Sequence, residues 1–214
     1  MTTLWEAATW IGRNGAEFRE ALGQHLLMCG IALGIGLLIG LPLAVAVNNR
    51  PLLAAVAING VNAVRMLPSL AILAAALPVL GIGLVPSVVA LVVLALPPIL
   101  LNAHVGLRGL DADVLDAATG MGMRRRQLLW RVQLPLAAPA MFAGARTAAV
   151  QVLAGATLAS FIGGGGLGDF ITAGIAIGDM ARLLVGAIPV ALLAVGTEFG
   201  LAALERRLFG ATAA

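Results

Sequence analysis

The sequence alternates between long apolar stretches and short charged segments. Stretches without any charged residue cover 26–49, 66–107 and 147–168. A membrane-spanning helix needs about 20 consecutive apolar residues. The stretch 66–107 therefore holds one crossing and part of another, with residues 80–83 as the turn between them. The pattern predicts five helices, which lie near 24–47, 52–80, 84–107, 136–162 and 182–205, and their prolines are expected to break several of them.

The composition excludes an ordinary soluble protein. Hydrophobic residues make up 61% of the chain and charged residues 11%, against about 25% charged in a typical soluble domain. We therefore predict an all-α polytopic membrane protein with one transmembrane domain over 1–214. The charged segment 1–22 carries Trp5 and Trp10, which suit the outer membrane interface. A frayed terminus is an equally weighted alternative.

The distribution of the basic residues predicts the orientation. All thirteen are arginines, and the chain has no lysine. With the N-terminus outside, three arginines lie in outer segments (13, 19 and 182) and eight in inner segments (50, 108, 124, 125, 126, 131, 206 and 207). This asymmetry fits the positive-inside rule and places the C-terminus inside a cell (inner) membrane that the chain crosses several times. A second copy or a paralogue would supply the symmetry that transporters commonly use.

Several kinds of chemistry lack the residues that they need. Without lysine there is no Schiff base and no Walker A loop, so a partner chain would have to bind any Mg-ATP. Cys29 is the only cysteine, which excludes a disulfide within the chain. Asp111, Asp113 and Asp116 suit the capping of a helix better than a metal site. We expect no enzymatic activity, no metal and no cofactor in this chain, and surfaces that face lipids and partner proteins rather than nucleic acid.

The segment 108–135 is the one long polar, arginine-rich loop. Its middle is helical in character, and Ala118 and Gly122 are four residues apart, so they are expected to share a smooth helical face. A second short helix is expected over 124–131. The simpler alternative is an ordinary loop that carries inner positive charges.

Seven positions of this loop resemble the EAA loop of ABC importer permeases. They are Asp116, Ala117, Ala118, Gly122, Val132, Leu134 and Pro135, with Asp in place of the usual Glu and Val in place of the usual Ile. The resemblance implies a type I ABC importer permease fold. It also implies that the cytoplasmic loop 108–135 docks onto a separate ATPase subunit, itself a dimer, which binds ATP-Mg.

Residues 61–107 and 136–178 resemble permeases that import glycine betaine, carnitine or choline. Permeases of methionine importers share the five-helix plan and a similar glycine stretch, but 68–70 and 143–155 favour the osmoprotectant branch. The resemblance implies a separate binding protein, periplasmic or anchored to lipid, that delivers the substrate. A self-sufficient channel or proton-coupled carrier is the alternative, and such a carrier needs buried ionisable groups along its path.

A glycine-rich segment follows the fourth predicted helix. Since no strand precedes it and no lysine follows, we interpret it as a tight re-entrant turn on the outer side rather than a phosphate loop. The family resemblance implies that the binding protein docks nearby. The segment comprises Gly163, Gly164, Gly165, Gly166, Gly168 and Asp169.

Three charged residues fall within the predicted spans. Arg65, with Pro68 and Ser69, is a candidate for the pathway or gate, and the alternative is a structural cap on carbonyls that the proline frees. At 1.5 Å per residue, Arg146 and Glu198 lie roughly 15 Å and 10 Å from the inner face. They are therefore predicted to form an ion pair, although each facing water independently is the alternative.

The aromatic and histidine residues add two expectations. The chain has no tyrosine and three tryptophans, all outside the predicted pathway. It therefore lacks an aromatic cage for a quaternary ammonium group, and tight recognition is expected from the separate binding protein. His25 and His104 lie near the ends of spans and are predicted to be interfacial.

Overall fold

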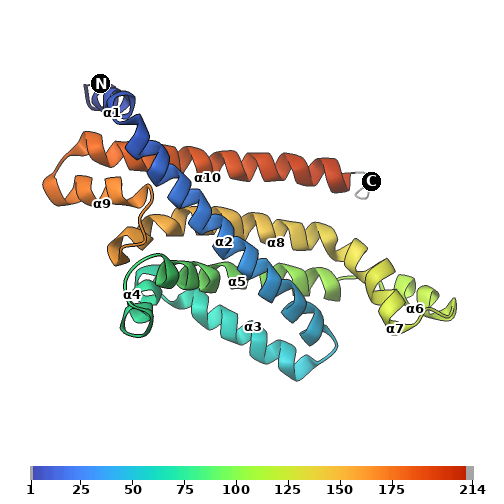
Figure 1. Ribbon diagram of the computed structural model, residues 1–214. Helices are drawn as coiled ribbons and strands as arrows, with labels where there is room; N and C mark the ends of the chain where they lie inside the picture. Colours follow the sequence, from blue (N-terminus) through green and yellow to red (C-terminus); the bar gives the residue numbers. More distant parts are fainter. Residues whose placement is uncertain (1, 211–214) are drawn as a thin grey trace.

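The computed structural model describes residues 2–210, and all regular secondary structure in this part of the chain is helical (Figure 1). A π-helical turn, η1, and a 3₁₀ helix, η2, interrupt the α-helices. In chain order the elements are α1 (Thr2–Arg13), α2 (Gly15–Asn48), α3 (Pro51–Met66), α4 (Ser69–Leu80), α5 (Leu84–Arg108), α6 (Ala112–Gly120), α7 (Arg125–Leu128), η1 (Leu129–Gln133), α8 (Leu134–Gly155), η2 (Ala156–Ile162), α9 (Gly168–Ile177) and α10 (Met180–Phe209).

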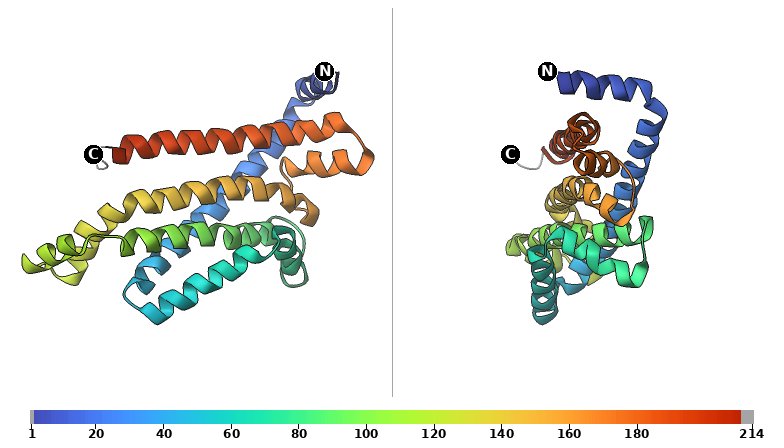
Figure 2. Two further views of the ribbon diagram at one scale, coloured as in Figure 1. Left: turned by 180° about the vertical axis from the view of Figure 1, so that it is seen from behind. Right: turned by 90° about the vertical axis from the view of Figure 1, so that its left-hand side faces the viewer.

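The centre of the molecule is formed by α2, α5 and α8. Helices α5 and α8 run side by side, and α2 crosses them obliquely (Figures 1 and 2). At Gly144 a Cβ would lie 2.7 Å from the carbonyl oxygen of Pro98, and at Gly40 a Cβ would lie 2.7 Å from the side chain of Ile99. Small residues let helices approach closely where lipid gives no hydrophobic driving force for association.

The predicted single helix over 52–80 is wrong. The structure has two helices, α3 and α4, which meet at an angle of 100°. Leu67 and Pro68 separate them, and Leu67 is extended with ψ 135°. A proline lacks the N–H of a helical hydrogen bond and disfavours helical geometry in the residue before it.

The other prolines in the predicted spans do not break their helices, contrary to expectation. Pro42 lies inside α2, and Pro97 and Pro98 lie inside α5. The side-chain amide of Asn102 donates a hydrogen bond of 2.8 Å to the carbonyl of Pro98. Since α5 is packed between its neighbours, tertiary contacts hold it continuous where two backbone hydrogen bonds are missing.

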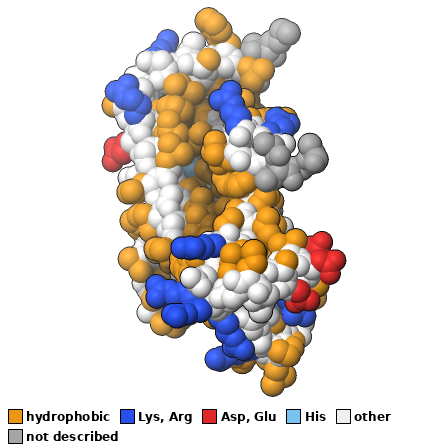
Figure 3. Space-filling model, turned by 90° about the vertical axis from the view of Figure 1, so that its right-hand side faces the viewer, with side chains coloured by type: hydrophobic (Ala, Val, Ile, Leu, Met, Phe, Trp, Pro, Cys, Tyr) orange, Lys and Arg blue, Asp and Glu red, His pale blue; other side chains and the backbone are white. Residues whose placement is uncertain are grey.

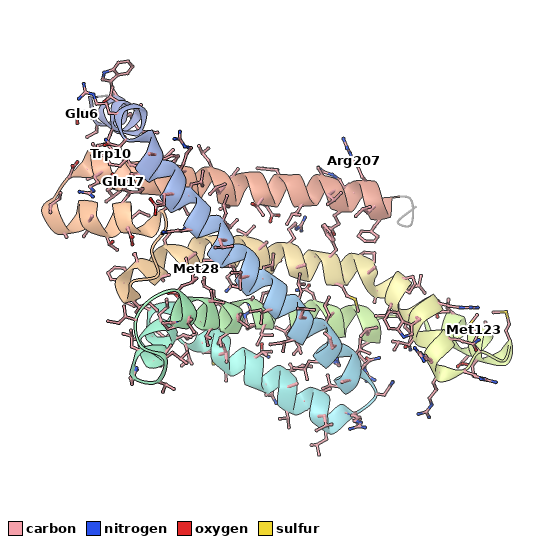
Figure 4. The ribbon with its side chains drawn as sticks, viewed as in Figure 1. Glu6, Trp10, Glu17, Met28, Met123 and Arg207 are labelled. Atoms are coloured by element: carbon pink, nitrogen blue, oxygen red, sulfur yellow. The ribbon has the colours of Figure 1, made fainter. Side chains whose placement is uncertain are left out.

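The first long helix starts earlier than predicted. Helix α2 begins at Gly15 rather than near residue 24, so the end of the predicted segment 1–22 belongs to it. Helix α1 packs beside α10, and the ring of its Trp10 meets that of Phe170 in α9 edge-on at 5.1 Å between centroids. Trp5 is exposed. Figure 4 shows Trp10 and Glu17 at the same end of the molecule.

The fourth predicted span, 136–162, corresponds to α8 and η2, and helical structure precedes it without a break. Pro135 has no N–H, and the turn before it is a π turn in which the N–H of Leu134 bonds the carbonyl of Leu129. A π turn absorbs such an irregularity within a helix. The sequence analysis missed α9, and α10 extends a few residues beyond the predicted 182–205 at both ends.

Helix α1 and the C-terminal end of α10 lie at opposite ends of the molecule (Figures 1 and 2). We call the end that holds the α2–α3 junction, the α6–α7 loop and the C-terminal end of α10 the loop end. The opposite end holds α1, the α4–α5 turn and the α9–α10 junction. Figure 3 views the loop end and shows several groups of arginines on it.

Candidate functional sites

The α6–α7 loop begins with a capped helix. The carboxylate of Asp111 accepts a hydrogen bond of 2.9 Å from the backbone N–H of Asp113. This is the helix-capping role that the sequence predicted for this group of aspartates. Because Asp111 caps α6, which covers Ala112–Gly120, the first three positions of the EAA-like pattern, 116–118, lie on this helix.

Gly122 ends this helix instead of extending its face. Its φ is +82°, its N–H bonds the carbonyl of Thr119 at 2.9 Å, and the N–H of Met123 bonds that of Ala118 at 3.3 Å. These two bonds form a Schellman motif, whose left-handed position favours glycine. The predicted smooth face shared by Ala118 and Gly122 is therefore wrong, because α6 ends at Gly120.

The prediction that Ala118 lies on an accessible helical face is also wrong. Ala118 is 3% exposed, whereas Asp116 and Ala117 are exposed. Helix α6 lies against α7, so Ala118 belongs to the inner packing of the loop. The accessible face of α6 is the one that carries Asp113, Asp116 and Ala117, and the exposed Met121 follows it.

The second half of the loop continues directly into a long helix. The predicted helix over 124–131 is present from Arg125 onward, as α7 (Arg125–Leu128) and η1, but it does not end before the next span and continues directly into α8. Val132 lies in η1, and Leu134 and Pro135 begin α8. A surface groove of about 390 Å³ follows this junction, lined by Arg124, Arg126, Gln127, Trp130 and Arg131. Figure 4 shows Met123 at the tip of the loop, next to this junction. A movement of α7 would therefore be transmitted along one helix to α8.

The glycine segment at the opposite end joins η2 to α9 and packs on α2 and α5. Gly163, Gly165 and Gly166 all have φ between +71° and +86°. The N–H of Gly166 donates to the side-chain oxygen of Gln24 at 3.3 Å, and the N–H of Gly83 donates to the carbonyl of Ile162 at 2.8 Å. The first bond ties the segment to α2, and the second ties the end of η2, directly before the segment, to the turn between α4 and α5.

Two further contacts close the packing of this segment. A Cβ at Gly168 would collide with the carbonyl oxygen of Thr157, so only glycine fits there. His25 is fully buried against Gly166, and its Nε2 lies 3.2 Å from the carbonyl of Leu153. The prediction that His25 is interfacial is wrong.

A groove of about 340 Å³ lies beside the glycine segment. Its polar lining consists of Glu17, Glu20, Gln24, Asp169 and Arg182. Burial raises the pKa of the Asp169 carboxyl above its usual value, because removal from water disfavours the charged form. The groove thus carries three carboxyl groups against one guanidinium at this end of the molecule.

Arg146 makes two ion pairs between α8 and α10. Its Nε lies 3.5 Å from Oε1 of Glu198, and its Nη1 lies 3.1 Å from Oε2 of Glu205. The first pair, between Arg146 and Glu198, confirms the ion pair that was predicted from the sequence. The second was missed, although Glu205 follows Glu198 by seven residues and so shares its helical face.

Arg65 lies at the end of α3, one residue before the break. With Ser69 it lines a cavity of about 200 Å³, whose third polar side chain is Gln151 of α8. Pro68 separates α3 from α4 and does not line the cavity. The sequence analysis did not single out Gln151, although it is an isolated polar residue in an apolar span.

Comparison with known proteins identifies the family. Residues 36–210 match the family described as binding-protein-dependent transport system inner membrane component. The chain belongs to this family. It is an integral, multi-pass membrane protein and a permease subunit of an ATP-driven importer, not an enzyme.

Relatives cover nearly the whole chain. The glycine betaine/carnitine/choline transport system permease protein OpuCB of Bacillus subtilis is 40% identical over 94% of this chain and 92% of its own length. The choline transport system permease protein OpuBB of the same organism is 42% identical over 91% and 90%. The carnitine transport permease protein OpuCB of Listeria monocytogenes is 41% identical over 94% and 92%.

Solved structures share the fold. An inward-facing structure of the MetNI methionine ABC transporter superposes with a TM-score of 0.77 at 24% identity, covering 86% of this chain and 92% of the other. An amino acid ABC transporter with histidines gives a TM-score of 0.75 at 20% identity, covering 93% and 97%. At these identities the likeness concerns the fold, which is that of ABC importer permeases.

Proposed function

We propose that this chain is the permease of an importer for osmoprotectant quaternary amines such as glycine betaine, carnitine and choline. The observation that carries the proposal is the identity of about 40%, over nine-tenths of the chain or more, with relatives named for these compounds. The similarity to a methionine transporter is below 25% identity and supports only the fold. We therefore prefer the osmoprotectant substrate to the methionine-type alternative.

The proposed orientation has the N-terminus outside and the loop end in the cytoplasm of a cell whose inner membrane the chain crosses five times. Four helices are long and apolar enough to cross a membrane, and the bent pair α3–α4 is counted as the fifth crossing. The positions of α1 and of the C-terminal end of α10 at opposite ends of the molecule are consistent with an odd number of crossings. The eight arginines expected inside belong to segments of the loop end, which supports this orientation.

The proposed coupling surface is the exposed face of α6 with the junction into α8. A separate ATPase dimer that binds ATP-Mg would dock there. In this proposal Asp116 and Ala117 make the contact, Ala118 and Gly122 maintain the shape of the loop, and Val132, Leu134 and Pro135 connect it to α8. The continuous helical path from α7 to α8 supports this division of roles.

The proposed docking surface for the substrate-binding protein is the opposite end, around the glycine segment and the acidic outer groove. This partner would be periplasmic or anchored to lipid. We also propose that a second copy of this chain, or a paralogue, completes the pathway. A proton-coupled carrier is less well supported, because the two carboxylates that lie within the described spans away from their outer ends, Glu198 and Glu205, are both paired with Arg146 and therefore offer no free proton relay.

Reconstitution of the importer tests the proposed function. The permease is placed in liposomes with the ATPase and binding protein of its own organism, and uptake of labelled glycine betaine, carnitine, choline and methionine is measured with and without ATP. We expect ATP-dependent uptake of at least one of the three amines and none of methionine. Uptake of methionine alone, or uptake by the permease without its partners, would refute the proposal.

The variant Ala117→Trp tests the coupling surface. Ala117 is exposed on α6, so the larger side chain leaves the fold intact and blocks docking. We expect normal membrane levels and loss of both ATPase co-purification and uptake. Leu208→Trp, an exposed position on α10 at the same end, is the matched control and should keep both activities. Normal uptake by Ala117→Trp would show that the ATPase binds elsewhere.

A further inference from the structure

Arg65 is a charged residue without a counter-charge. Among the described residues, no carboxylate lies within ion-pair distance of it and no side chain accepts a hydrogen bond from it. Helix α3 begins at Pro51, so Arg65 lies roughly 20 Å along the helix at 1.5 Å per residue. A lone charge at such a depth is costly and is normally paired or placed in a polar path.

Among the described residues, no acidic side chain is available to supply the missing charge. The spans contain two acidic residues away from their outer ends, Glu198 and Glu205, and both pair with Arg146. The other eight acidic residues lie near the ends of the molecule or in its loops, at positions 6, 17, 20, 111, 113, 116, 169 and 179. An anion that fits Arg65 must therefore come from another molecule.

The surroundings of Arg65 define what such an anion can be. Arg65, Ser69 and Gln151 line one cavity from three different helices, α3, α4 and α8. In the described structure none of the three side chains makes a hydrogen bond, so their donors are free. The cavity volume of about 200 Å³ is below the range of about 300–1,000 Å³ typical of drug-sized ligands. The remaining lining is apolar: Val64, Leu67, Leu94 and Pro97.

We propose that this cavity is a transport site for the carboxylate of a small zwitterion, with Arg65 as the charged ligand and Ser69 and Gln151 as neutral donors. A planar guanidinium binds a carboxylate through two parallel hydrogen bonds. The inference rests on the proposed function and narrows its substrate class. It assigns glycine betaine and carnitine, which carry a carboxylate, to this site, and leaves choline, which carries none, without a partner there.

The other end of such a substrate has no dedicated partner. A quaternary ammonium group is best held by aromatic rings, and none of the residues lining the cavity is aromatic. The methyl groups would instead contact the apolar lining. Recognition at this site thus depends on the carboxylate, and loss of Arg65 must affect the carboxylated substrates selectively.

The test compares two substrates in the reconstituted importer with its ATPase and binding protein. Uptake of glycine betaine and of choline is measured for the wild type and for Arg65→Gln. Since charge-assisted hydrogen bonds are among the stronger ones, we expect the ratio of betaine to choline uptake to fall at least about tenfold. The binding protein is unchanged, so the altered ratio reports on the permease. Arg50→Gln, at the other end of α3 and outside the cavity, is the matched control and should leave the ratio unchanged.

A second variant, Gln151→Glu, tests the same site if Arg65→Gln fails to assemble. Gln151→Glu places a carboxylate in the same cavity, where it can pair with Arg65 and compete with the substrate. We expect the same selective loss of betaine uptake, with choline uptake maintained within about twofold. Equal effects on both substrates, or no effect on either, in the variant that assembles would overturn the proposed site.

The wild-type result separates this proposal from the proposed function. If the wild-type importer takes up none of glycine betaine, choline and carnitine, the proposed osmoprotectant function itself is refuted. If it takes up choline but no carboxylated amine, the function stands and the carboxylate site is refuted. Carnitine serves as a second carboxylated substrate and should follow glycine betaine in both variants.

Discussion

The packed centre formed by α2, α5 and α8 contrasts with the bent pair α3–α4 at its side. In the centre, glycines bring backbones together, and continuous helices include prolines. In the bent pair, one proline coincides with a break of 100°, and most side chains are exposed. The two regions also differ in their arginines, because Arg146 is paired twice and Arg65 is unpaired.

This contrast separates residues that maintain the fold from residues that are available for transport. A group whose hydrogen bonds and charges are satisfied within the chain contributes to stability, and its loss leaves a buried partner unsatisfied. A group without an internal partner contributes little to stability and is free to bind a substrate. The predictions below compare a residue that is packed or paired within the chain with one that is not.

The largest difference in lost stability is expected between leucine substitutions at Gly144 and at Gly60. A Cβ at Gly144 would lie 2.7 Å from the carbonyl of Pro98 and 2.8 Å from Cβ of Asn102, whereas at Gly60 nothing lies within 4 Å. Gly144→Leu must therefore separate α5 from α8 and should destabilise the protein by about 3 kcal/mol. Gly60→Leu should cost less than about 0.5 kcal/mol. Thermal unfolding in detergent measures both, and equal losses would show that α5 and α8 do not depend on close packing.

A smaller difference is expected between the two arginines. Arg146→Gln leaves Glu198 and Glu205 without a counter-charge, and because these side chains are partly exposed we expect a loss of about 2 kcal/mol, between the values for surface and buried pairs. Arg65→Gln removes no pair and should change stability by less than about 0.5 kcal/mol.

A double-mutant cycle provides the control for the ion pairs. Arg146→Gln combined with Glu198→Gln should cost less than the sum of the single variants, because the neutral glutamine no longer needs a partner. Unfolding midpoints of the four proteins give the coupling. Strictly additive losses would mean that the contact between α8 and α10 does not stabilise the fold.

The smallest difference is expected between Gly166 and Gly81. Both have positive φ, +86° and +75°, so an alanine at either position should cost about 1 kcal/mol of backbone strain. At Gly166 a Cβ would also lie 3.2 Å from the backbone and side chain of His25, whereas Gly81 faces open space. We expect Gly166→Ala to be less stable than Gly81→Ala by about 1 kcal/mol. Unfolding midpoints that rank the two variants in the opposite order would show that the contact with His25 does not restrict the side chain at position 166.

The approximate positions of the four long apolar helices follow from the sequence, because the membrane imposes a minimum length of apolar chain that is visible locally. The EAA-like spacing likewise found the loop that leads into α8. Two further features, one in this loop and one on α10, were also visible in the sequence. A glycine just after a helix is a signal for a helix end, which is the role of Gly122, and the seven-residue spacing from Glu198 pointed to Glu205.

Other features were decided only by the tertiary structure. Pro68 and Pro97 are the same residue in similarly apolar surroundings, yet α3–α4 bends and α5 does not, because only α5 is packed between neighbours that hold it straight. The fully buried position of His25 depends on the glycine segment, more than a hundred residues away in the chain. The cavity that joins Arg65, Ser69 and Gln151 depends in the same way on the packing of three helices. Hydropathy and residue spacing are local properties of the sequence. They therefore could not determine which of these side chains contact residues that are distant in the sequence.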